Sequence, residues 1–205
     1  MSTTEHWDGR YLEIGSTKVS WYEPEPTTSL DAIAGIYPEL AEQSVIDVGG
    51  GTSELADSLW EAGCRDLTVV DLSAAALAEA AVRSQALGAE ITYLQADLRD
   101  WLPTRTYQIW HDRAVFHFLT EETERAHYRS ALLAGLAIGG HIVLAVFAED
   151  GPTSCSALPV RRHSIAGLSE WLGAEFRVLS GFRKEHTTPS GSSQSFNWVT
   201  AVRIS

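Results

Sequence analysis

The chain has 205 residues, of which 44% are hydrophobic and 20% are charged, and this balance favours one globular domain over a disordered chain. Its formal net charge of −12 argues against a nucleic-acid partner, because such surfaces need clustered Lys and Arg. Cys64 and Cys155 fit no metal-binding or disulfide pattern, and no apolar stretch is long enough for a signal peptide or a membrane span. We therefore expect a cytoplasmic protein with no metal, nucleic-acid or membrane partner.

Apolar strand-like runs alternate with helical patterns along most of the chain. The predicted strands are 44–48, 67–70, 91–95, 107–111 and 141–147. The predicted helices are 53–63, 73–87 and 121–136, with Ser73 and Thr120 as the N-caps of the second and third. This order predicts an α/β fold with a mainly parallel sheet covered on both faces. Near the end, the turn-rich TTPSGSS separates two strand-like runs and predicts an antiparallel hairpin at the edge of the sheet.

Three glycines and two acidic residues follow the first three predicted strands. Gly49, Gly50 and Gly51 lack Cβ, so another group can approach their N–H groups closely. Asp71 ends the second strand 20 residues after Gly51, the spacing at which a carboxylate accepts hydrogen bonds from both hydroxyls of a ribose. Asp97 follows the third strand and can accept a hydrogen bond from the exocyclic amine of an adenine. The pattern predicts a ribose-bearing cofactor at the carboxyl ends of the strands.

The remaining residues narrow the choice of cofactor. Glu54 stands where a dinucleotide fingerprint needs a small residue, and it would repel a pyrophosphate. Neither Lys18 nor Lys184 follows a glycine, which excludes a phosphate-binding P-loop, and the Tyr-x-x-x-Lys pair of reductases is also missing. S-adenosylmethionine, a cationic nucleoside without phosphate, fits this set: its ribose would bind Asp71, its adenine Asp97, and its amino-acid tail the glycine turn. Asp47 either contacts the cofactor or, as we expect, only holds the turn.

Four successive stretches carry a family resemblance. DVGGGTSEL, TVVDLS, QADL and LLAGLAIGGHIVLAVF resemble the ordered motifs of class I S-adenosylmethionine-dependent methyltransferases, over residues 45–147. The resemblance implies a Rossmann-like, doubly wound, three-layer α/β/α fold whose seven-stranded sheet has the order 3-2-1-4-5-7-6 with strand 7 antiparallel. It also implies a set of cofactor-binding residues, which are Asp47, Gly49, Gly50, Gly51, Asp71, Leu72, Asp97 and Leu98.

Residues 1–43 are rich in Trp and Tyr and precede the predicted core, residues 44–205, of a single domain. This segment resembles the N-terminal segment of small-molecule thiol methyltransferases and of the protein-lysine methyltransferases that act on translation elongation factor 1A. The resemblance implies a lid that closes over the cofactor, with Trp7, Arg10, Tyr11 and Trp21 as candidate contacts. Alternatively, the aromatic side chains only pack an N-terminal helix onto the sheet.

The stretch WHDRAVFHFL after the fourth strand holds the candidate catalytic residues. His117 is the candidate general base, because histidine titrates near neutral pH. Asp112 would orient its imidazole or hold a cationic acceptor, and Arg113 would neutralise an anionic one. Two structural alternatives are an aromatic wall that contains His117 and a local ion pair between Asp112 and Arg113.

These observations predict an enzyme that transfers a methyl group from S-adenosylmethionine to an N, O or S nucleophile of a small molecule and releases S-adenosylhomocysteine. The reaction is an in-line displacement that depends mainly on positioning and exclusion of water, so no metal is needed. Protein-lysine N-methylation is the alternative acceptor class. A nicotinamide oxidoreductase and an inactive cofactor-binding module are alternatives from other classes.

Overall fold

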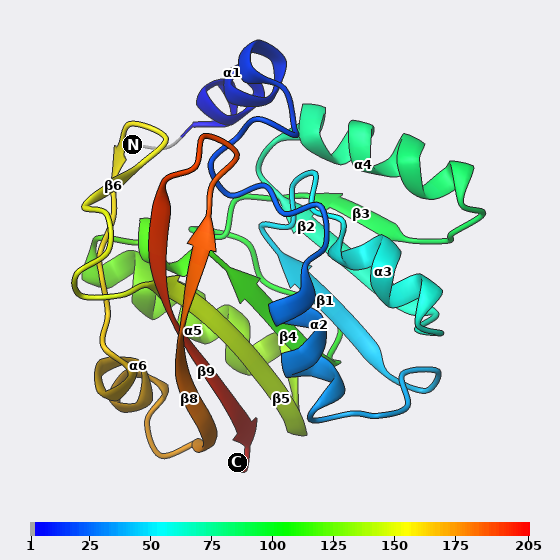
Figure 1. The fold of residues 1–205 in the computed structure, drawn as a ribbon. Coiled ribbons are helices and arrows are strands. Elements are labelled where there is room, and N and C mark those ends of the chain that lie inside the picture. The colour runs from blue at the N-terminus through cyan, green and yellow to red at the C-terminus, as the bar shows by residue number, and fades with distance from the viewer. Residues whose placement is uncertain (1–2) are drawn as a thin grey trace.

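A seven-stranded sheet runs through the centre of the molecule (Figure 1), and the computed structural model describes residues 3–205. Its strands in chain order are β1 (Ser44–Val48), β2 (Asp66–Asp71), β3 (Thr92–Gln95), β4 (Tyr107–Arg113), β5 (Leu136–Phe147), β8 (Phe176–Thr187) and β9 (Ser193–Arg203). In space they follow the order β3-β2-β1-β4-β5-β9-β8. All neighbours pair in parallel except β9, which is antiparallel to both β5 and β8. The predicted fold, strand order and terminal hairpin are confirmed.

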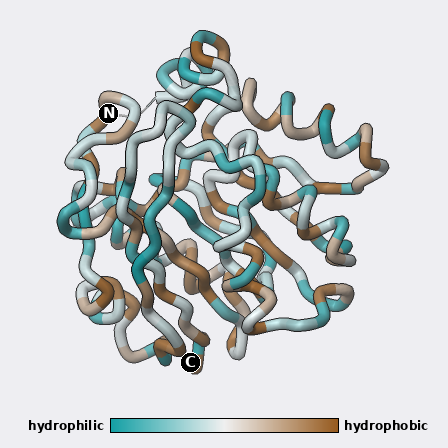
Figure 2. The backbone as a smooth tube through the Cα atoms, viewed as in Figure 1, coloured by the Kyte–Doolittle hydropathy of each residue, from teal (hydrophilic) through white to brown (hydrophobic). Residues whose placement is uncertain are grey.

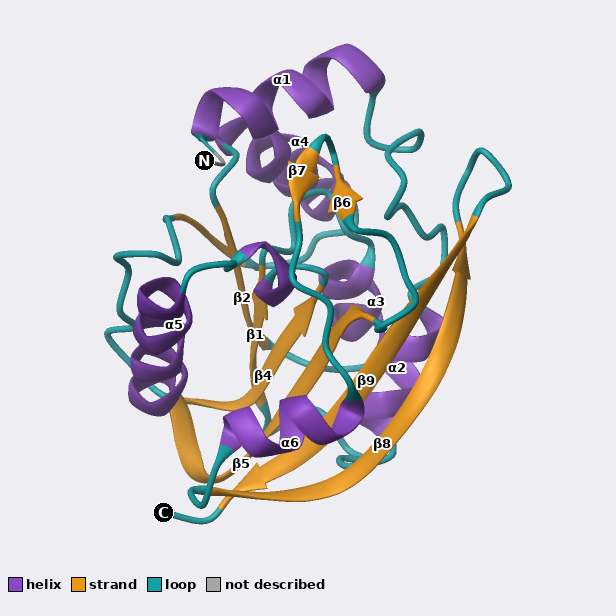
Figure 3. Ribbon diagram, turned by 90° about the vertical axis from the view of Figure 1, so that its left-hand side faces the viewer, coloured by secondary structure: helices purple, strands orange, loops and turns teal. Residues whose placement is uncertain are grey.

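Helices cover both faces of the sheet. On one face lie α2 (Thr27–Ala34), α3 (Leu55–Glu61) and α4 (Ala74–Ala86), and on the other lie α5 (Glu122–Gly135) and α6 (Ile165–Leu172). Figure 3 shows α5 and the pair α2 and α3 on opposite sides of the strands. The strands are rich in hydrophobic residues (Figure 2), and these divide between two buried cores, one on each face of the sheet.

Alternation along the strands decides which side chains enter which core. Ile46 and Val48 of β1 pack with Trp110 and Tyr128 on the α5 face, whereas Val45 packs on the α2 face. Asp47 has the same parity as Val45, and it is buried. The central strands are therefore apolar on both sides, and a buried acid among them needs a partner.

The start of α5 differs from the sequence expectation. Thr120 is not the N-cap; Glu121 is, because its side chain accepts the N–H of Glu124 while the Glu124 carboxylate accepts the N–H of Glu121 at 3.1 Å. This reciprocal pair satisfies two N–H groups that a single threonine could not. The other predicted cap is confirmed, since Ser73 Oγ accepts the N–H of Ala76 at 3.1 Å.

Several short elements surround the carboxyl ends of the strands. The helix α1 (Thr4–Ile14) lies over this edge and packs on α4, as Figure 1 shows at the top of the molecule. A 3-10 turn, η1 (Phe116–Phe118), follows β4, and the strands β6 (Ser154–Cys155) and β7 (Leu158–Pro159) form a small hairpin after β5. Within residues 3–205, none of the helices has the length and apolar character needed to cross a bilayer.

Candidate active site

A cavity of about 310 Å³ lies at the carboxyl ends of β1 to β4, under α1. The sequence-predicted residues that line it are Trp7, Tyr11, Trp21, Gly49, Asp71, Leu72, Asp97, Leu98 and Arg113. Those that do not line it are Arg10, Asp47, Gly50, Gly51, Asp112 and His117. Eight of the twelve predicted cofactor-binding residues thus meet at one cavity, while the other four and two of the three predicted catalytic residues lie outside it.

Asp71 ends β2 and turns its carboxylate toward the cavity. One oxygen, Oδ1, accepts the backbone N–H of Ser73 at 2.7 Å. Burial raises the pKa of Asp71 to about 6, although the N–H groups of Ser73 and Gly51 lower it. At neutral pH this carboxylate is ionised and retains hydrogen-bonding capacity on Oδ2 for a diol such as a ribose. Leu72 lines the cavity beside it.

Asp97, after β3, is paired with an arginine that the sequence analysis missed. Arg99 Nε lies 2.8 Å from Asp97 Oδ1 and 3.1 Å from Oδ2, and both residues line the cavity. These hydrogen bonds hold the pKa of Asp97 below its usual range. The backbone N–H of Arg99 also donates to Oδ1 at 3.0 Å and its Nη2 to Oδ2 at 2.5 Å, so each oxygen already accepts two hydrogen bonds from Arg99. The spacing in QADLRD, an acid two residues before an arginine, was the available signal for this pair.

Side chains of the protein itself pack closely against the glycine turn. Gly49 and Gly51 have positive φ angles, +67° and +51°. A Cβ on Gly49 would overlap Val115, and a Cβ on Gly51 would overlap the hydroxyl of Tyr11. Only Gly49 also lines the cavity. Glycine is required here for two reasons: the backbone has positive φ angles, and neighbouring side chains occupy the space that a Cβ would need. The backbone of Gly49 still faces the cavity.

Asp47 lies behind this turn and holds a structural network. His111 Nδ1 is 2.7 Å from Asp47 Oδ1, and His111 Nε2 is 2.9 Å from Ser29 Oγ. All three residues are buried, and they border a second, smaller cavity of about 40 Å³ that also reaches Gly50. Asp47 therefore faces the turn from the side away from the larger cavity.

The N-terminal segment supplies aromatic side chains to the cavity. Trp7 forms edge-to-face contacts with Trp21 and Phe118, with ring centroids 5.7 and 5.1 Å apart, and Tyr11 contacts Trp21 at 5.9 Å. Arg10 points elsewhere, because its Nε donates to Ser156 Oγ in the β6–β7 hairpin at 3.2 Å. The expectation that Arg10 contacts the cavity is therefore wrong, although it attaches α1 to an element that does line the cavity.

Arg113 and Asp112, at the end of β4, have separate partners instead of pairing with each other. Arg113 is mostly buried; its Nη2 lies 2.9 Å from Glu23 Oε1 and its Nη1 donates to the carbonyl of Trp21 at 3.0 Å. Asp112 is 0% exposed and accepts the N–H groups of Val115 and Phe116. A catalytic position for Asp112 is therefore wrong, because its carboxylate folds the chain into η1.

His117 does not face the cavity, so the expected position for a general base is also wrong. Its side chain is 0% exposed and lies against Phe147, whose N–H points at His117 Nδ1 over 3.4 Å. Burial, aided by nearby positive charge, lowers the pKa of His117 to about 3. In η1 it is Phe118, one residue later, that lines the cavity, so His117 belongs to the wall behind it.

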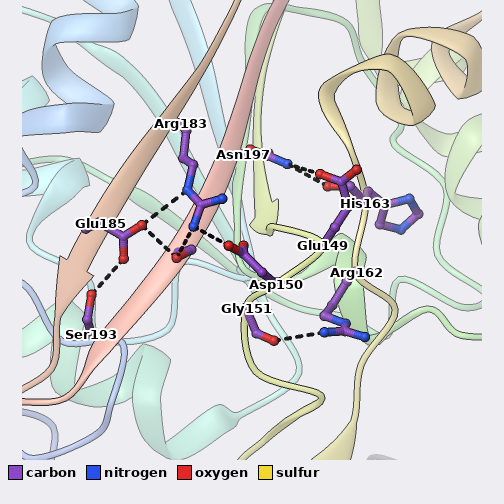
Figure 4. Close-up of polar contacts among 10 residues, drawn as sticks. Glu149, Asp150, Gly151, Arg162, His163, Arg183, Glu185, Ser193 and Asn197 are labelled. Atoms are coloured by element: carbon purple, nitrogen blue, oxygen red, sulfur yellow. Dashed lines mark hydrogen bonds and ion pairs between the residues drawn. The ribbon is translucent and has the colours of Figure 1, made fainter.

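The loop between β5 and α6 forms one wall of the cavity through Cys155, Leu158 and Pro159. Figure 4 shows how β8 and β9 hold its two ends. At one end Arg183 Nη2 donates to Asp150 Oδ2 at 2.8 Å, and at the other Asn197 Nδ2 donates to the carbonyl of His163 at 2.8 Å. The hairpin at the edge of the sheet thus fixes the loop that carries the wall.

The lining residues fall into two groups. The strand-end side is Gly49, Asp71, Leu72, Ala96, Asp97, Leu98 and Arg99. The aromatic side comes from the N-terminal segment, the chain after β4 and the β6–β7 hairpin, and it is Trp7, Tyr11, Trp21, Arg113, Ala114, Val115, Phe118, Leu119, Thr120, Glu121, Glu124, Cys155, Leu158 and Pro159. One side offers hydrogen-bonding groups for a nucleoside, and the other offers mainly apolar surface. No group of three or more His, Cys, Asp or Glu side chains suited to a metal ion occurs among residues 3–205.

Comparison with known proteins shows which family this chain resembles. Residues 45–140 match the family model described as a methyltransferase domain. The eEF1A lysine and N-terminal methyltransferase of Mus musculus is 24% identical over 133 residues, which are 60% of this chain and 17% of that protein. The chain thus spans less than a quarter of the length of such curated relatives, 17% for the mouse protein and 22% for that of Danio rerio.

Solved structures share the fold. A structure concerned with the conversion of a disulfide bond into a thioacetal group during echinomycin biosynthesis has a TM-score of 0.77 at 19% identity, over 98% of this chain and 93% of that one. The Burkholderia thailandensis 1,6-didemethyltoxoflavin-N1-methyltransferase with bound S-adenosylhomocysteine has a TM-score of 0.71 at 20% identity, over 98% and 85%. The sheet and its helices form the Rossmann-like methyltransferase fold. Residues 45–140 are thus similar to a methyltransferase domain, and the chain shares its fold with S-adenosylmethionine-dependent methyltransferases, which supports S-adenosylmethionine as the cofactor.

Proposed function

We propose that this methyltransferase acts on a small molecule, at an N, O or S atom, inside the 310 Å³ cavity. The observation that carries the proposal is the continuity of that cavity from Asp71 and Asp97 to an apolar wall beneath α1. A pocket lined mainly by apolar groups is typical of small-ligand sites. The cavity lies under a helix, so an acceptor that enters it is withdrawn from bulk water.

The cofactor would occupy the strand-end side. Asp71 would accept hydrogen bonds from the ribose hydroxyls, and Asp97 would accept one from the adenine amine in place of one from Arg99. Leu72 and Leu98 would pack against the nucleoside, and the turn at Gly49 would take the amino-acid tail. Bound there, S-adenosylmethionine supplies an electrophilic methyl group on a sulfonium.

The protein would contribute position rather than proton transfer. The aromatic side would hold the acceptor close to the methyl group and keep water out. This positioning lowers the activation barrier of the in-line displacement. Arg113 would have two tasks there: its hydrogen bond to the carbonyl of Trp21 holds the N-terminal segment in place, and its guanidinium borders the cavity.

Residues 3–43 would act as a cap over this site within a single domain that includes the core 44–205. Support comes from α1, which packs on α4 and touches the β6–β7 hairpin through Arg10. We also place the protein in the cytoplasm, where its two buried, free cysteines would stay reduced.

Protein-lysine methylation is the second candidate function. It is favoured by the curated relatives, which are named as methyltransferases of lysine and of the N-terminus of eEF1A. The deciding experiment incubates the protein and methyl-labelled cofactor with a fractionated lysate. Label in the low-molecular-weight fraction is the expected result, and label confined to one protein band would replace the first candidate with the second.

A further inference from the structure

Arg99 and Arg113 line the larger cavity, and each has a carboxylate partner. Arg99 pairs with Asp97, which lines the same cavity, so the two charges compensate each other there. Arg113 pairs with Glu23, and its Nη2 lies 2.9 Å from Glu23 Oε1. Glu23 borders the smaller cavity behind the glycine turn and not the larger one, whereas Arg113 borders both. The larger cavity is therefore lined by the cation of this second pair and not by its anion.

Arg113 lies beside the glycine turn. In the sheet, Val48 of β1 pairs with Asp112 of β4. The residues that follow these two, Gly49 and Arg113, both border the larger and the smaller cavity. In the proposed binding mode, Asp71 holds the ribose of the cofactor and Gly49 its amino-acid tail. The sulfur of S-adenosylmethionine joins these two parts, so its positive charge would lie between Asp71 and Gly49, on the stretch of the cavity beside Arg113.

Two further acids of the lining, Glu121 and Glu124, belong to a different part of the cavity. They form the capping box of α5, in which each carboxylate accepts the backbone N–H of the other residue. Hydrogen bonds to Asp97 and, to a smaller extent, the charge of Glu124 raise the pKa of Arg99. Both acids thus lie near Arg99, at the end of the cavity proposed for the adenine, and the ion-pair partner of Arg113 is Glu23.

An arginine without a partner would make its stretch of the cavity unfavourable for a cation. Two like charges repel each other, and the repulsion grows as water is excluded from between them. The side chain of Arg113 is mostly buried, so solvent screens its charge only weakly. A carboxylate in contact with the guanidinium compensates this charge, and Glu23 is in that position.

Glu23 is held in place as a carboxylate. His186 Nδ1 lies 3.3 Å from Glu23 Oε1, and His186 Nε2 lies 2.7 Å from the carbonyl oxygen of Ser20. Burial raises the pKa of Glu23, but the hydrogen bond from His186 and the charge of Arg113 outweigh this effect and hold the pKa below its usual range. Glu23 is therefore ionised at neutral pH, and contacts from β8 and from β4 fix it beside the guanidinium.

We propose that Glu23 enables the site to bind a positively charged cofactor, because it neutralises Arg113 from the side of the smaller cavity; the inference rests on the proposed methyltransferase function. Glu23 acts through Arg113, so it is a positioning residue. After methyl transfer the sulfur of S-adenosylhomocysteine is uncharged and gains nothing from this compensation. The pair of Glu23 and Arg113 thus favours the methyl donor over the spent product.

Calorimetry with S-adenosylmethionine and with S-adenosylhomocysteine tests the proposal without turnover. The two ligands share the adenosine and the amino-acid tail, and they differ in the methyl group and the charge on sulfur. Glu23→Gln keeps the shape of the side chain and should weaken binding of S-adenosylmethionine at least tenfold more than binding of S-adenosylhomocysteine, on the order of the loss of one charge compensation. Glu25→Gln, at an exposed position of the same segment, is the matched control and should leave the ratio of the two affinities unchanged. Equal weakening of both ligands in Glu23→Gln would show a purely structural role and would overturn the proposal.

Arg113→Met in the Glu23→Gln background identifies the cause. With no guanidinium left to compensate, the ratio of the two affinities should return to within about threefold of the wild-type ratio, whatever happens to the absolute affinities. A ratio that stays at the value of Glu23→Gln would mean that the charge of Arg113 is not responsible, and the proposal would be wrong.

The same titrations separate this inference from the proposed function. If the wild-type protein binds neither ligand, the proposed function fails. If it binds both and the ratio of affinities is the same in wild type and in Glu23→Gln, the function stands and the role of Glu23 is wrong.

Discussion

Asp8 Oδ1 accepts a hydrogen bond of 2.6 Å from Ser73 Oγ, and this contact joins the N-terminal helix to the residue that begins α4. The same oxygen accepts the N–H of Ala75 at 3.2 Å. Ser73 in turn donates its own N–H to Asp71. A carboxylate at the N-terminus of a helix is favourable, because it meets free N–H groups and the positive end of the helix dipole. α1 is therefore attached next to the candidate ribose-binding residue.

The first prediction tests this attachment. Asp8→Ala should lower the free energy of unfolding by about 1 kcal/mol, as the loss of a helix cap typically does, and should weaken S-adenosylhomocysteine binding about fivefold. Glu13→Ala, at an exposed position on the same helix, is the control and should change neither quantity. Calorimetry and urea unfolding measure the two effects. Stability lost with unchanged affinity would separate α1 from the cofactor site.

The second prediction concerns the charge of Asp71. Because its folded pKa is about 6, affinity for S-adenosylhomocysteine should be constant above pH 7 and should decline as the pH falls below 6 and the carboxylate takes up a proton. Asp71→Asn should bind about 10- to 100-fold more weakly at pH 8 and should lose this pH dependence, since a charge-assisted hydrogen bond contributes roughly 1.5 to 3 kcal/mol. Asp66→Asn, at the exposed start of the same strand, should behave as the wild type. A wild-type pH profile in Asp71→Asn would remove Asp71 from the site.

A third prediction uses two glycines with positive φ. Gly51→Ala and Gly63→Ala both place an alanine in the left-handed region, which costs roughly 1 to 2 kcal/mol. Only at Gly51 would the new methyl group also meet Tyr11, whereas at Gly63 it would meet no atom within 4 Å. Chemical denaturation should therefore show a larger loss for Gly51→Ala.

The background Tyr11→Phe checks the cause of that difference. Removing the hydroxyl should restore part of the stability lost in Gly51→Ala and should leave the cost of Gly63→Ala unchanged. Strict additivity of Gly51→Ala and Tyr11→Phe would mean that the two residues do not interact.

The fourth prediction follows from the buried imidazole of His117. Its folded pKa of about 3 is far below the unfolded value near 6.5, so its contribution to stability is complete above pH 6.5 and is lost as the pH falls toward 3. His117→Leu removes this loss. Between pH 7.5 and pH 5, the stability of the variant relative to wild type should rise by about 2 kcal/mol, at about 1.4 kcal/mol per pH unit below 6.5.

The stability of the variant must be compared with that of the wild type because other titratable groups change the pH dependence of stability in the direction opposite to His117. Burial raises the pKa of Asp71 and of Asp112 to about 6, so both carboxyl groups stabilise the fold as the pH falls through 6. Those contributions are common to both proteins and cancel in the difference. The same pH dependence of stability in His117→Leu and wild type would show that His117 is not buried in neutral form.

The sequence predicted the strands and the strand-end residues well, because apolar runs define buried parallel strands, Asp71 ends one of them and Asp97 lies two residues after another. It failed at His117 because the distance from Arg113 to His117 suggested one α-helical turn. The chain instead forms a 3-10 turn, in which residues three apart share a face. Val115 and Phe118 therefore line the cavity together, and His117 points into the core.

The loop after β5 lay beyond sequence analysis for another reason. Its position depends on side chains that lie far away in the chain, Arg183 on β8 and Asn197 on β9, which bind Asp150 and the carbonyl of His163. No local propensity encodes such contacts. The same holds for Arg10 and Ser156, which are 146 positions apart.

The overlap that a Cβ on Gly49 would make with Val115 carries a consequence for evolution. One methyl group of Val115 fills the space that any side chain at position 49 would need. The two positions, one in the turn after β1 and one in the segment after β4, are therefore expected to covary. A homologue with alanine at position 49 is expected to have glycine or alanine at position 115, and this exchange would widen the cavity at the point where the two segments meet.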